Sequence, residues 1–134
     1  MATTMITKLD EKNPSVAFLG PRGTYSQAAV IEHFGSTCEL LECAGIEDVF
    51  AAVEEHYADF GVVPVENSTE GAINNTQDCL LHSSLKIIGE KIVNIEHNLL
   101  ANQEADGSKV DTIASHQQSL AQCRHWLKKH YPKA

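Results

Sequence analysis

The stretch "VAFLGPRGTYSQAAVIEHFG", residues 16–35, decides the fold because it contains a strand, a turn and a helix in direct succession. The short apolar run over residues 16–20 is typical of a buried strand. Pro21 and Gly23 favour a turn, and Thr24 stands three residues before a glutamine, the spacing of a helix capping box. The apolar residues that follow recur at helical spacing and end at a glycine, which predicts one helix with a defined stop.

The same alternation of strand and helix continues along the chain. "CELLECA", residues 38–44, predicts a second strand, and "FGVVPV", residues 60–65, predicts a third strand that is buried on both faces and has Pro64 near its end. Between them, "IEDVFAAVEEHYADFG" contains the clearest helix of the chain. Its apolar face is formed by Ile46, Val49, Phe50, Val53 and Tyr57. Strands that alternate with helices predict an α/β fold with a largely parallel sheet.

The second half of the sequence predicts four further elements. They are a helix over residues 67–84, a long extended strand over 85–101 that bends at Gly89, a strand over 110–115 and a helix over 116–132. Asn67 and Glu70 have capping-box spacing at the start of the first of these helices, and Ser115 and Gln118 have it at the start of the last.

Charge restricts the kinds of ligand. The chain has 134 residues and a formal net charge of −8, so bulk electrostatics will not attract nucleic acid or an anionic membrane. We therefore expect neither as a partner. A bound anion must instead be met locally, by backbone N–H groups or by a single well-placed cation.

The four cysteines indicate the compartment. They show no metal-binding spacing, and the histidines are scattered, so we expect free thiols and no metal site. Free thiols suggest a reducing compartment. Residues 1–14 contain no apolar signal-peptide core and are expected to be flexible, and no run is long enough to span a membrane. These features together predict a cytoplasmic protein.

Three places share one design, in which a short strand ends, a polar or glycine-rich turn follows and a helix begins. They are "GPRGTYS" (20–26), "PVENSTEG" (64–71) and "ASHQQS" (114–119). In an open α/β sheet such corners lie beyond the carboxyl ends of the strands, where ligands bind. Each helix start offers unpaired N–H groups and a partial positive charge. Any one corner is more often only a capped helix, but several together predict a crevice for a small anion.

The three corners also carry a family resemblance. "GPRGTYSQAA", "ADFGVVPVENSTEGAINNTQD", "HNLLA" and "ASHQQSLAQC" stand in the order, and near the spacing, of the signature segments of prephenate dehydratase. The sequence resembles the dehydratase domain of that enzyme, or of bacterial bifunctional chorismate mutase–prephenate dehydratase, over roughly residues 15–130.

The resemblance implies a fold similar to that of type-2 periplasmic binding proteins, with two α/β lobes and a cleft between them. Residues 15–134 would then form a partial prephenate dehydratase domain. Lobe one would cover about 15–85, a crossing strand about 86–100, and the start of lobe two about 101–134.

The resemblance also implies a reaction and a set of residues. Prephenate would lose water and CO2 to give phenylpyruvate, a step of phenylalanine biosynthesis, without a metal or organic cofactor. The expected substrate-binding residues are Asn67, Ser68, Thr24, Gly71, Ser115, Gln118, His116 and Arg22. The expected supporting residues are Glu66, Tyr25, Gly23 and Glu70.

Several of these residues have an alternative role that the sequence leaves open. Asn67 and Thr24 would also serve as helix caps, His116 as a structural residue at a helix start, and Arg22 as a solvated side chain. Glu66 is assigned a structural role because a carboxylate beside a dianion is unfavourable unless it is paired.

The sequence departs from the family pattern in two ways. The family usually has Ser-His-Pro-Gln at the third corner, where this chain has Ser-His-Gln-Gln, residues 115–118. The Thr-Arg segment with the family's essential threonine, and the regulatory ACT domain expected in the full-length protein, are not among these 134 residues. We therefore expect little or no activity from the chain alone. A non-catalytic small-anion binding or sensing domain is the alternative, and an uncovered sheet edge would favour a homo-oligomer.

Overall fold

The structure is a computed structural model that describes residues 13–68, 71–102, 106 and 109–134. It contains two compact units, Met1–Val93 and Asn94–Ala134. No helix in the described part of the chain is long and apolar enough to cross a membrane. The four cysteines are free, with Cys38 and Cys43 buried and the other two half-buried.

The first unit is built on a three-stranded parallel sheet with the order β2-β1-β3. The strands are β1 (Ser15–Leu19), β2 (Glu39–Cys43) and β3 (Phe60–Val62). β1 lies in the centre, where Val16 pairs with Leu40 on one side and Phe60 on the other. The three predicted strands and their parallel arrangement are confirmed, and Pro64 lies two residues beyond the last of them. The predicted burial of the third strand on both faces is wrong, because Gly61 is exposed and Phe60 and Val62 are only half-buried.

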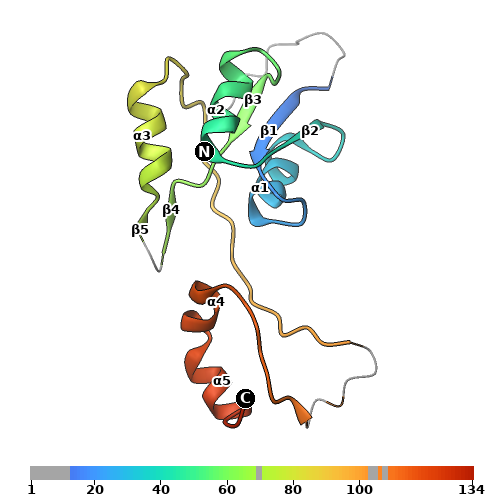
Figure 1. Cartoon of the computed structure of the whole chain (residues 1–134). Coiled ribbons are helices and arrows are strands. Elements are labelled where there is room, and N and C mark those ends of the chain that lie inside the picture. The colour runs from blue at the N-terminus through green and yellow to red at the C-terminus, as the bar shows by residue number, and fades with distance from the viewer. Residues whose placement is uncertain (1–12, 69–70, 103–105, 107–108) are drawn as a thin grey trace, which may run out of the picture. The chain divides into compact units, whose positions relative to one another are not determined.

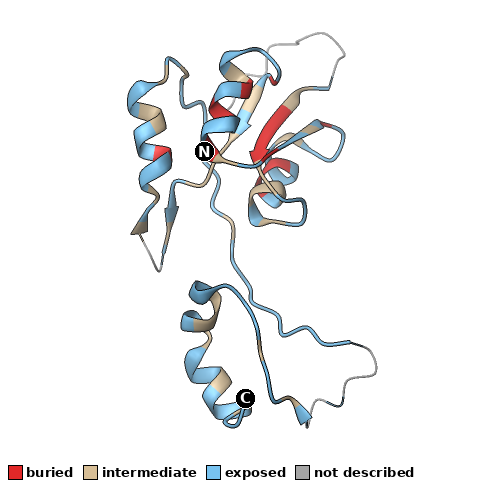
Figure 2. Cartoon of the chain, in the orientation of Figure 1, coloured by how far each residue is buried: buried red, intermediate tan, exposed pale blue. Residues whose placement is uncertain are grey.

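Both faces of β1 are buried, each against a different helix (Figures 1 and 2). Val16 and Phe18 pack with Val30 of α1 (Tyr25–Phe34), whereas Ala17 packs with Val49 of α2 (Ile46–Glu54). This division follows from the two-residue period of a strand, which sends successive side chains to opposite faces. Four of these side chains are at most 1% exposed: Val16, Phe18, Val30 and Val49. Burial of each such side chain stabilises the fold by about 1.5–3 kcal/mol.

The two helices stop where the backbone leaves the right-handed region. Gly35 has a φ of 87° and its N–H donates to the Ile31 carbonyl, which confirms the predicted stop of α1. α2 ends at Glu54, and His56 has a φ of 62°. Because the helix does not continue, Tyr57 is 71% exposed. Its predicted place on the apolar face of this helix is therefore wrong.

The segment after β3 differs from the prediction. Instead of a helix from residue 67, it forms a hairpin of β4 (Glu66–Asn67) and β5 (Gly71–Ala72), followed by α3 (Asn74–His82). Gly71 has a φ of 81°, which a right-handed helix does not allow. Asn67 pairs with Gly71 across the hairpin, so its predicted role as a helix cap is wrong.

α3 packs beside α2 in the first unit (Figure 1). The Asn75 amide Nδ2 donates to Glu47 Oε1 at 3.1 Å, and the Ser83 hydroxyl donates to Glu54. These bonds use carboxylates from the polar face of α2. Part of the acidic face of α2 is therefore paired with α3.

A pair of side chains closes the amino end of the sheet. Asp59 Oδ2 accepts hydrogen bonds from both the backbone N–H and the hydroxyl of Ser15, each at 2.8 Å. The Asp59 N–H in turn donates to the Ser15 carbonyl at 2.9 Å. This exchange fixes the register between β1 and β3 at the end opposite the strand-to-helix corners.

The structure assigns no strand to residues 85–101, where the sequence predicts a long one. Lys91 Nζ lies 2.6 Å from Glu32 Oε1 of α1, so an ion pair fastens the end of the first unit to that helix. Strand pairing needs a partner in the sheet, and the residues that the structure describes supply none for this segment.

The second unit contains two short helices instead of the single predicted one. They are α4 (Gln117–Gln122) and α5 (Arg124–His130), separated by Cys123 with φ −88° and ψ 2°. The predicted strand over residues 110–115 is not assigned. The inner face of this helical region contains four half-buried residues, Ser119, Leu120, Cys123 and Leu127. His97 Nε2 lies 2.7 Å from Gln122 Oε1 and joins the start of this unit to α4.

Candidate functional site

The carboxyl ends of β1 and β3 lie side by side at one edge of the sheet, because the two strands are adjacent and parallel. Residues 20–24 follow β1, and residues 63–68 follow β3. The chain passes from β1 to β2 and then back past β1 to β3, with α1 and α2 on opposite faces of the sheet, so the strand order reverses between β1 and β3. The structure thus brings the first two predicted corners to one edge, as the sequence predicts.

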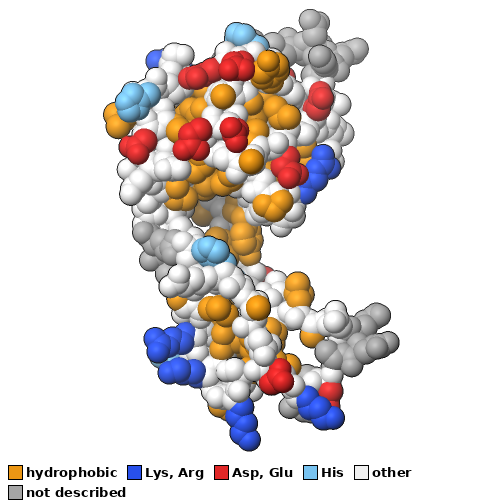
Figure 3. Space-filling model, in the orientation of Figure 1, with side chains coloured by type: hydrophobic (Ala, Val, Ile, Leu, Met, Phe, Trp, Pro, Cys, Tyr) orange, Lys and Arg blue, Asp and Glu red, His pale blue; other side chains and the backbone are white. Residues whose placement is uncertain are grey.

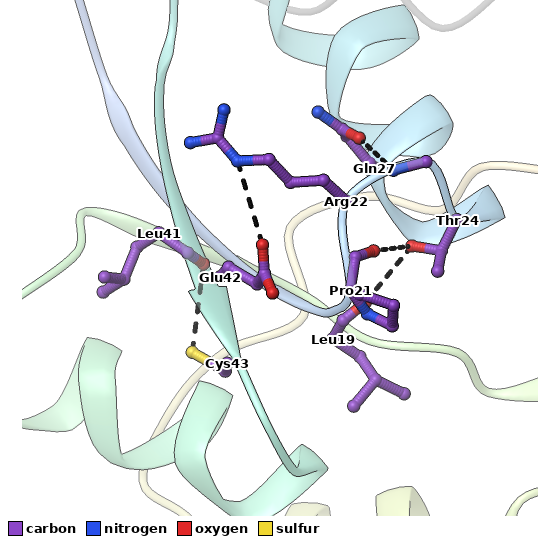
Figure 4. Close-up of polar contacts among 9 residues, drawn as sticks. Leu19, Pro21, Arg22, Thr24, Gln27, Leu41, Glu42 and Cys43 are labelled. Atoms are coloured by element: carbon purple, nitrogen blue, oxygen red, sulfur yellow. Dashed lines mark hydrogen bonds and ion pairs between the residues drawn. The ribbon is translucent and has the colours of Figure 1, made fainter.

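The first corner is shaped by side chains that bind its own backbone (Figure 4). Gly23 has a φ of 83°, and its N–H donates to Gln27 Oε1 at 2.6 Å. The Thr24 hydroxyl donates to the Pro21 carbonyl at 2.8 Å. Thr24 holds the N-cap position of α1 but makes no side-chain cap. The predicted capping bond of Thr24 is therefore wrong, because its hydroxyl closes the turn instead.

Arg22 is exposed and only loosely paired. Its Nε lies 3.8 Å from Glu42 Oε2, with 66% of the Arg22 side chain and 44% of the Glu42 side chain exposed (Figure 4). An exposed ion pair of this kind contributes little to stability, so the Arg22 side chain can leave Glu42 for another anion at little cost. Tyr25, the first residue of α1, is 42% exposed at the same corner.

The helix starts at this edge differ in charge. The first turn of α1 contains no acidic residue, whereas that of α2 contains Glu47 and Asp48. Asp48 Oδ2 also accepts the Gly45 N–H at 2.9 Å. Carboxylates in the first turn offset the positive end of a helix dipole. An anion at this edge is therefore attracted to the start of α1 more than to that of α2.

The second corner is anchored by α3. Thr76 is fully buried, and its hydroxyl donates to the Pro64 carbonyl at 2.6 Å. The Ile73 N–H donates to the Val65 carbonyl at 2.9 Å. Thr76 is not among the residues predicted from the sequence, although its helical spacing from Ile73 and Leu80 places it on the inward face of α3.

Beyond these anchors, the hairpin presents several of the predicted residues. Glu66 and Ser68 are exposed, Asn67 is half-buried, and Gly71 has the positive φ that the turn requires. Glu70 lies outside the described residues. The amide of Asn67 and the hydroxyl of Ser68 are neutral donors, which bind an anion without a shift in protonation.

The third predicted corner belongs to the second unit. The Gln118 N–H donates to His116 Nδ1 at 3.4 Å, so His116 is the N-cap of α4. The predicted capping role of Ser115 is therefore wrong, because His116 holds that position, and the binding role of His116 stays a prediction. Ser115, His116 and Gln118 are all exposed.

Cysteine chemistry at the sheet edge is disfavoured by the surroundings of Cys43, the last residue of β2. Burial, and secondly the charge of Asp48, raise the pKa of this thiol. A raised pKa keeps it protonated at neutral pH, and a protonated thiol is a poor nucleophile. Within the described residues, no group of three or more His, Cys, Asp or Glu side chains is arranged to hold a metal ion.

A parallel sheet edge with an uncompensated helix start, neutral donors and one exposed cation defines an α/β domain suited to a small anion. The family model for prephenate dehydratase matches residues 16–134. The chain therefore belongs to the prephenate dehydratase family.

Curated relatives agree with this assignment. The bifunctional chorismate mutase/prephenate dehydratase of Stutzerimonas stutzeri is 50% identical over 87% of this chain and 32% of its own length. The prephenate dehydratase of Methanocaldococcus jannaschii is 41% identical over 88% of this chain and 43% of its own length. The chain thus spans about a third of the length of the bifunctional relative.

A solved structure is also similar. The prephenate dehydratase of Arthrobacter aurescens, in complex with L-Phe, matches with a TM-score of 0.81 and 34% identity. The match covers 90% of this chain and 40% of that protein.

Proposed function

We propose that the carboxyl edge of the first unit binds prephenate as part of a prephenate dehydratase. The observation that carries this proposal is the meeting of two family corners at adjacent parallel strands, beside the start of α1, whose first turn has no acidic residue. Membership of the family supports prephenate as the anion. Because the chain spans about a third of its bifunctional relative, we do not assign the whole reaction to these residues alone.

The chemistry needs anion binding and help for a leaving group. In prephenate, the bond to the ring carboxylate breaks and its electron pair enters the ring, while the ring C–O bond breaks and releases hydroxide. The products are phenylpyruvate, CO2 and hydroxide, which a proton converts to water. Formation of an aromatic ring supplies much of the driving force, so the protein has to orient the substrate and stabilise the departing oxygen.

The residues at the edge suit these tasks. Ser68 and Asn67 would donate hydrogen bonds to the departing hydroxyl or to a carboxylate, and positioned donors of this kind contribute several kcal/mol in a site from which water is excluded. Arg22 would exchange its weak contact with Glu42 for a substrate carboxylate. Thr24 and the backbone of Gly71 would complete the contacts.

The surrounding residues would shape the edge. Gly23 and Tyr25 would form the first corner, and Glu66 would support the second without meeting the substrate. Glu70 keeps the supporting role that the sequence predicts for it.

The finer architecture follows from the same proposal. The first unit would be lobe one of a fold like that of type-2 periplasmic binding proteins, and the second unit would begin lobe two. Ser115, His116 and Gln118 would contact substrate from that second lobe. The cytoplasm is the proposed location, which four free cysteines favour. Two further predictions remain. One is a regulatory ACT domain in the full-length protein, and the other is self-association into a homo-oligomer.

Titration of the chain with prephenate tests the proposal. We expect saturable binding, followed by NMR shifts at residues 20–26 and 64–68, and a loss of affinity of about tenfold or more in an Asn67→Ala, Ser68→Ala variant. The control is Thr37→Val, an exposed threonine in a turn away from both corners. Absence of binding, or equal binding by the double variant, would overturn the proposal.

A phenylpyruvate assay on the same samples separates the proposed enzyme from the alternative, a non-catalytic small-anion domain. Phenylpyruvate formation that the double variant lacks would exclude the alternative. No observation in the structure specifically favours that alternative, and the names of the relatives argue against it.

A further inference from the structure

The end of β2 brings a carboxylate to the first corner. Glu42 is the next-to-last residue of β2, which pairs in parallel with β1. The Gly20 N–H donates to the Cys43 carbonyl at 2.8 Å, so the pairing of the two strands continues into the corner. In Figure 4 the Glu42 side chain points from β2 toward Arg22 and the turn at Pro21. A residue outside the family corners therefore contributes to this part of the edge.

Gly20 makes room for this side chain. A Cβ atom at position 20 would lie 2.5 Å from Glu42 Cγ and 3.1 Å from both Cδ and Oε1. Any other residue at position 20 would therefore push Glu42 out of the corner. Because Gly20 has no side chain, the Glu42 carboxylate can lie against the turn from which Arg22 extends.

The backbone of the same turn has few donors left for a ligand. The Gly20 N–H is used in the pairing with β2, and the Gly23 N–H donates to Gln27 Oε1 at 2.6 Å. Pro21 has no N–H to donate. An anion that binds this turn therefore depends mainly on Arg22, which is the residue that Glu42 contacts.

Arg22 is also a scarce cation in the first unit. Residues 13–93 contain two other Lys or Arg residues, Lys86 and Lys91, and Lys91 is paired with Glu32 at 2.6 Å. Figure 3 shows Asp and Glu side chains over the face of this unit that is in view. A carboxylate that arrives at the corner therefore competes with the chain's own carboxylates for a single cation.

The two neighbouring helix starts hold their counter-charges differently. Asp48 belongs to the first turn of α2 and accepts the Gly45 N–H at 2.9 Å, so its charge is fixed in place. The first turn of α1 has no acidic residue, and its counter-charge comes from Glu42. The Glu42 carboxylate is 44% exposed and lies 3.8 Å from Arg22 Nε, which is longer than a hydrogen bond. The counter-charge of α1 can therefore move into water, whereas that of α2 cannot.

We propose that Glu42 is a displaceable counterion of Arg22, which competes with the carboxylate of a ligand and lowers the affinity of the site. This role rests on the proposed function, because the ligand is the anion bound at this edge. Without ligand, Glu42 offsets part of the Arg22 charge. A carboxylate that binds the guanidinium through two hydrogen bonds forms the stronger pair, and repulsion between like charges sends Glu42 into solvent. The return of Glu42 to Arg22 then favours release of an anionic product.

A substitution that removes only the charge tests this role. Glu42→Gln keeps the shape of the side chain, and we expect it to raise the affinity for prephenate about two- to fivefold, the value of an exposed ion pair. The matched control is Glu39→Gln, which removes the same charge from an exposed residue at the opposite end of β2. This control should leave the affinity unchanged.

NMR signals of the Arg22 Nε–H group report the exchange directly. The chain contains two arginines, Arg22 and Arg124, so the spectrum of an Arg22→Lys variant assigns both signals. In the ligand-free chain, Glu42→Gln should shift the Arg22 signal and Glu39→Gln should not. At saturation with prephenate, the unaltered chain and the Glu42→Gln variant should give the same Arg22 signal, because Glu42 no longer contacts Arg22 in either.

The outcomes separate this role from the proposed function. If prephenate binds but Glu42→Gln gives no gain in affinity, or the same gain as Glu39→Gln, the role of Glu42 is overturned and the proposed function stands. An Arg22 signal that Glu42→Gln leaves in place in the ligand-free chain would also overturn it. If prephenate binds neither the unaltered chain nor any variant, the proposed function itself is overturned, and the role of Glu42 with it.

Discussion

The hydroxyl of Thr76 lies 2.6 Å from the carbonyl oxygen of Pro64 and donates a hydrogen bond to it from a fully buried position. This bond joins α3 to the backbone immediately before the hairpin that carries Asn67 and Ser68. The shape of the second corner therefore depends on a side chain that faces the interior and cannot touch a ligand in the open hairpin.

Replacement of Thr76 tests this dependence. Thr76→Val keeps the volume but leaves the Pro64 carbonyl without its donor, so we expect a loss of about 1–3 kcal/mol in the free energy of unfolding. Thr76→Ser keeps the donor and removes one methyl group, which costs about 1 kcal/mol. Urea unfolding measures the loss of stability in both variants, provided that the unfolding free energy depends on urea concentration with the same slope as in the unaltered chain. A serine variant that is less stable than the valine variant would contradict the importance of this hydrogen bond.

Gly61 of β3 provides a second test, because α2 passes close to it. A Cβ atom at this position would lie 3.0 Å from Val49 Cγ1 and 3.2 Å from Val53 Cγ2. Gly61→Ala should therefore destabilise the chain by about 1–3 kcal/mol, and an added Val53→Ala substitution should recover part of that loss. The thermal midpoint measures both effects.

The matched control for this substitution is Gly89→Ala. Its Cβ would meet only His33, at an ordinary 3.6 Å. This change should be neutral or slightly stabilising, since alanine reduces the entropy of the unfolded chain. If both alanine variants behaved alike, the close approach of α2 to β3 would not be the cause.

Cys43 predicts a dependence on alkaline pH. Its pKa in the folded chain is raised above the ordinary value of 9.0, first by burial and then by Asp48. Below that value, both folded and unfolded chains hold the thiol proton. As the pH rises, the unfolded chain loses the proton first, so the stabilising contribution is lost as the pH passes through the folded pKa.

We therefore expect the urea midpoint to fall as the pH rises above about 9, and to fall less in Cys43→Ala, which has no thiol to titrate. The difference between the two curves isolates the contribution of Cys43 from that of every other group. Parallel curves would contradict the raised pKa.

The first half of the fold was predictable because its information is local. β1, β2 and β3 are short apolar runs, and α1 and α2 have either an apolar period or a glycine stop that the sequence displays directly. The error at residue 67 also has a local cause. Asn, Ser and Thr before a glycine favour both a helix cap and a hairpin turn, and the positive φ of Gly71 decides for the turn.

The second half was less predictable because strands need partners distant in the sequence. Residues 85–101 and 110–115 have the alternation of strands, but among the described residues neither has a sheet partner. The candidate site shows the same limit. The sequence predicts both corners at the sheet edge, whereas the bond from Thr76 to Pro64 depends on how α3 returns against the corner, which no local pattern encodes.

The central position of β1 has a consequence for protein synthesis. Among the three strands of this sheet, β1 is synthesised first, yet it is the middle strand and needs β2 on one side and β3 on the other. Val16 and Phe18 therefore stay without their full set of partners until residues 60–62 emerge. The rate of translation over this interval sets how long an aggregation-prone apolar strand is exposed to chaperones and to other nascent chains.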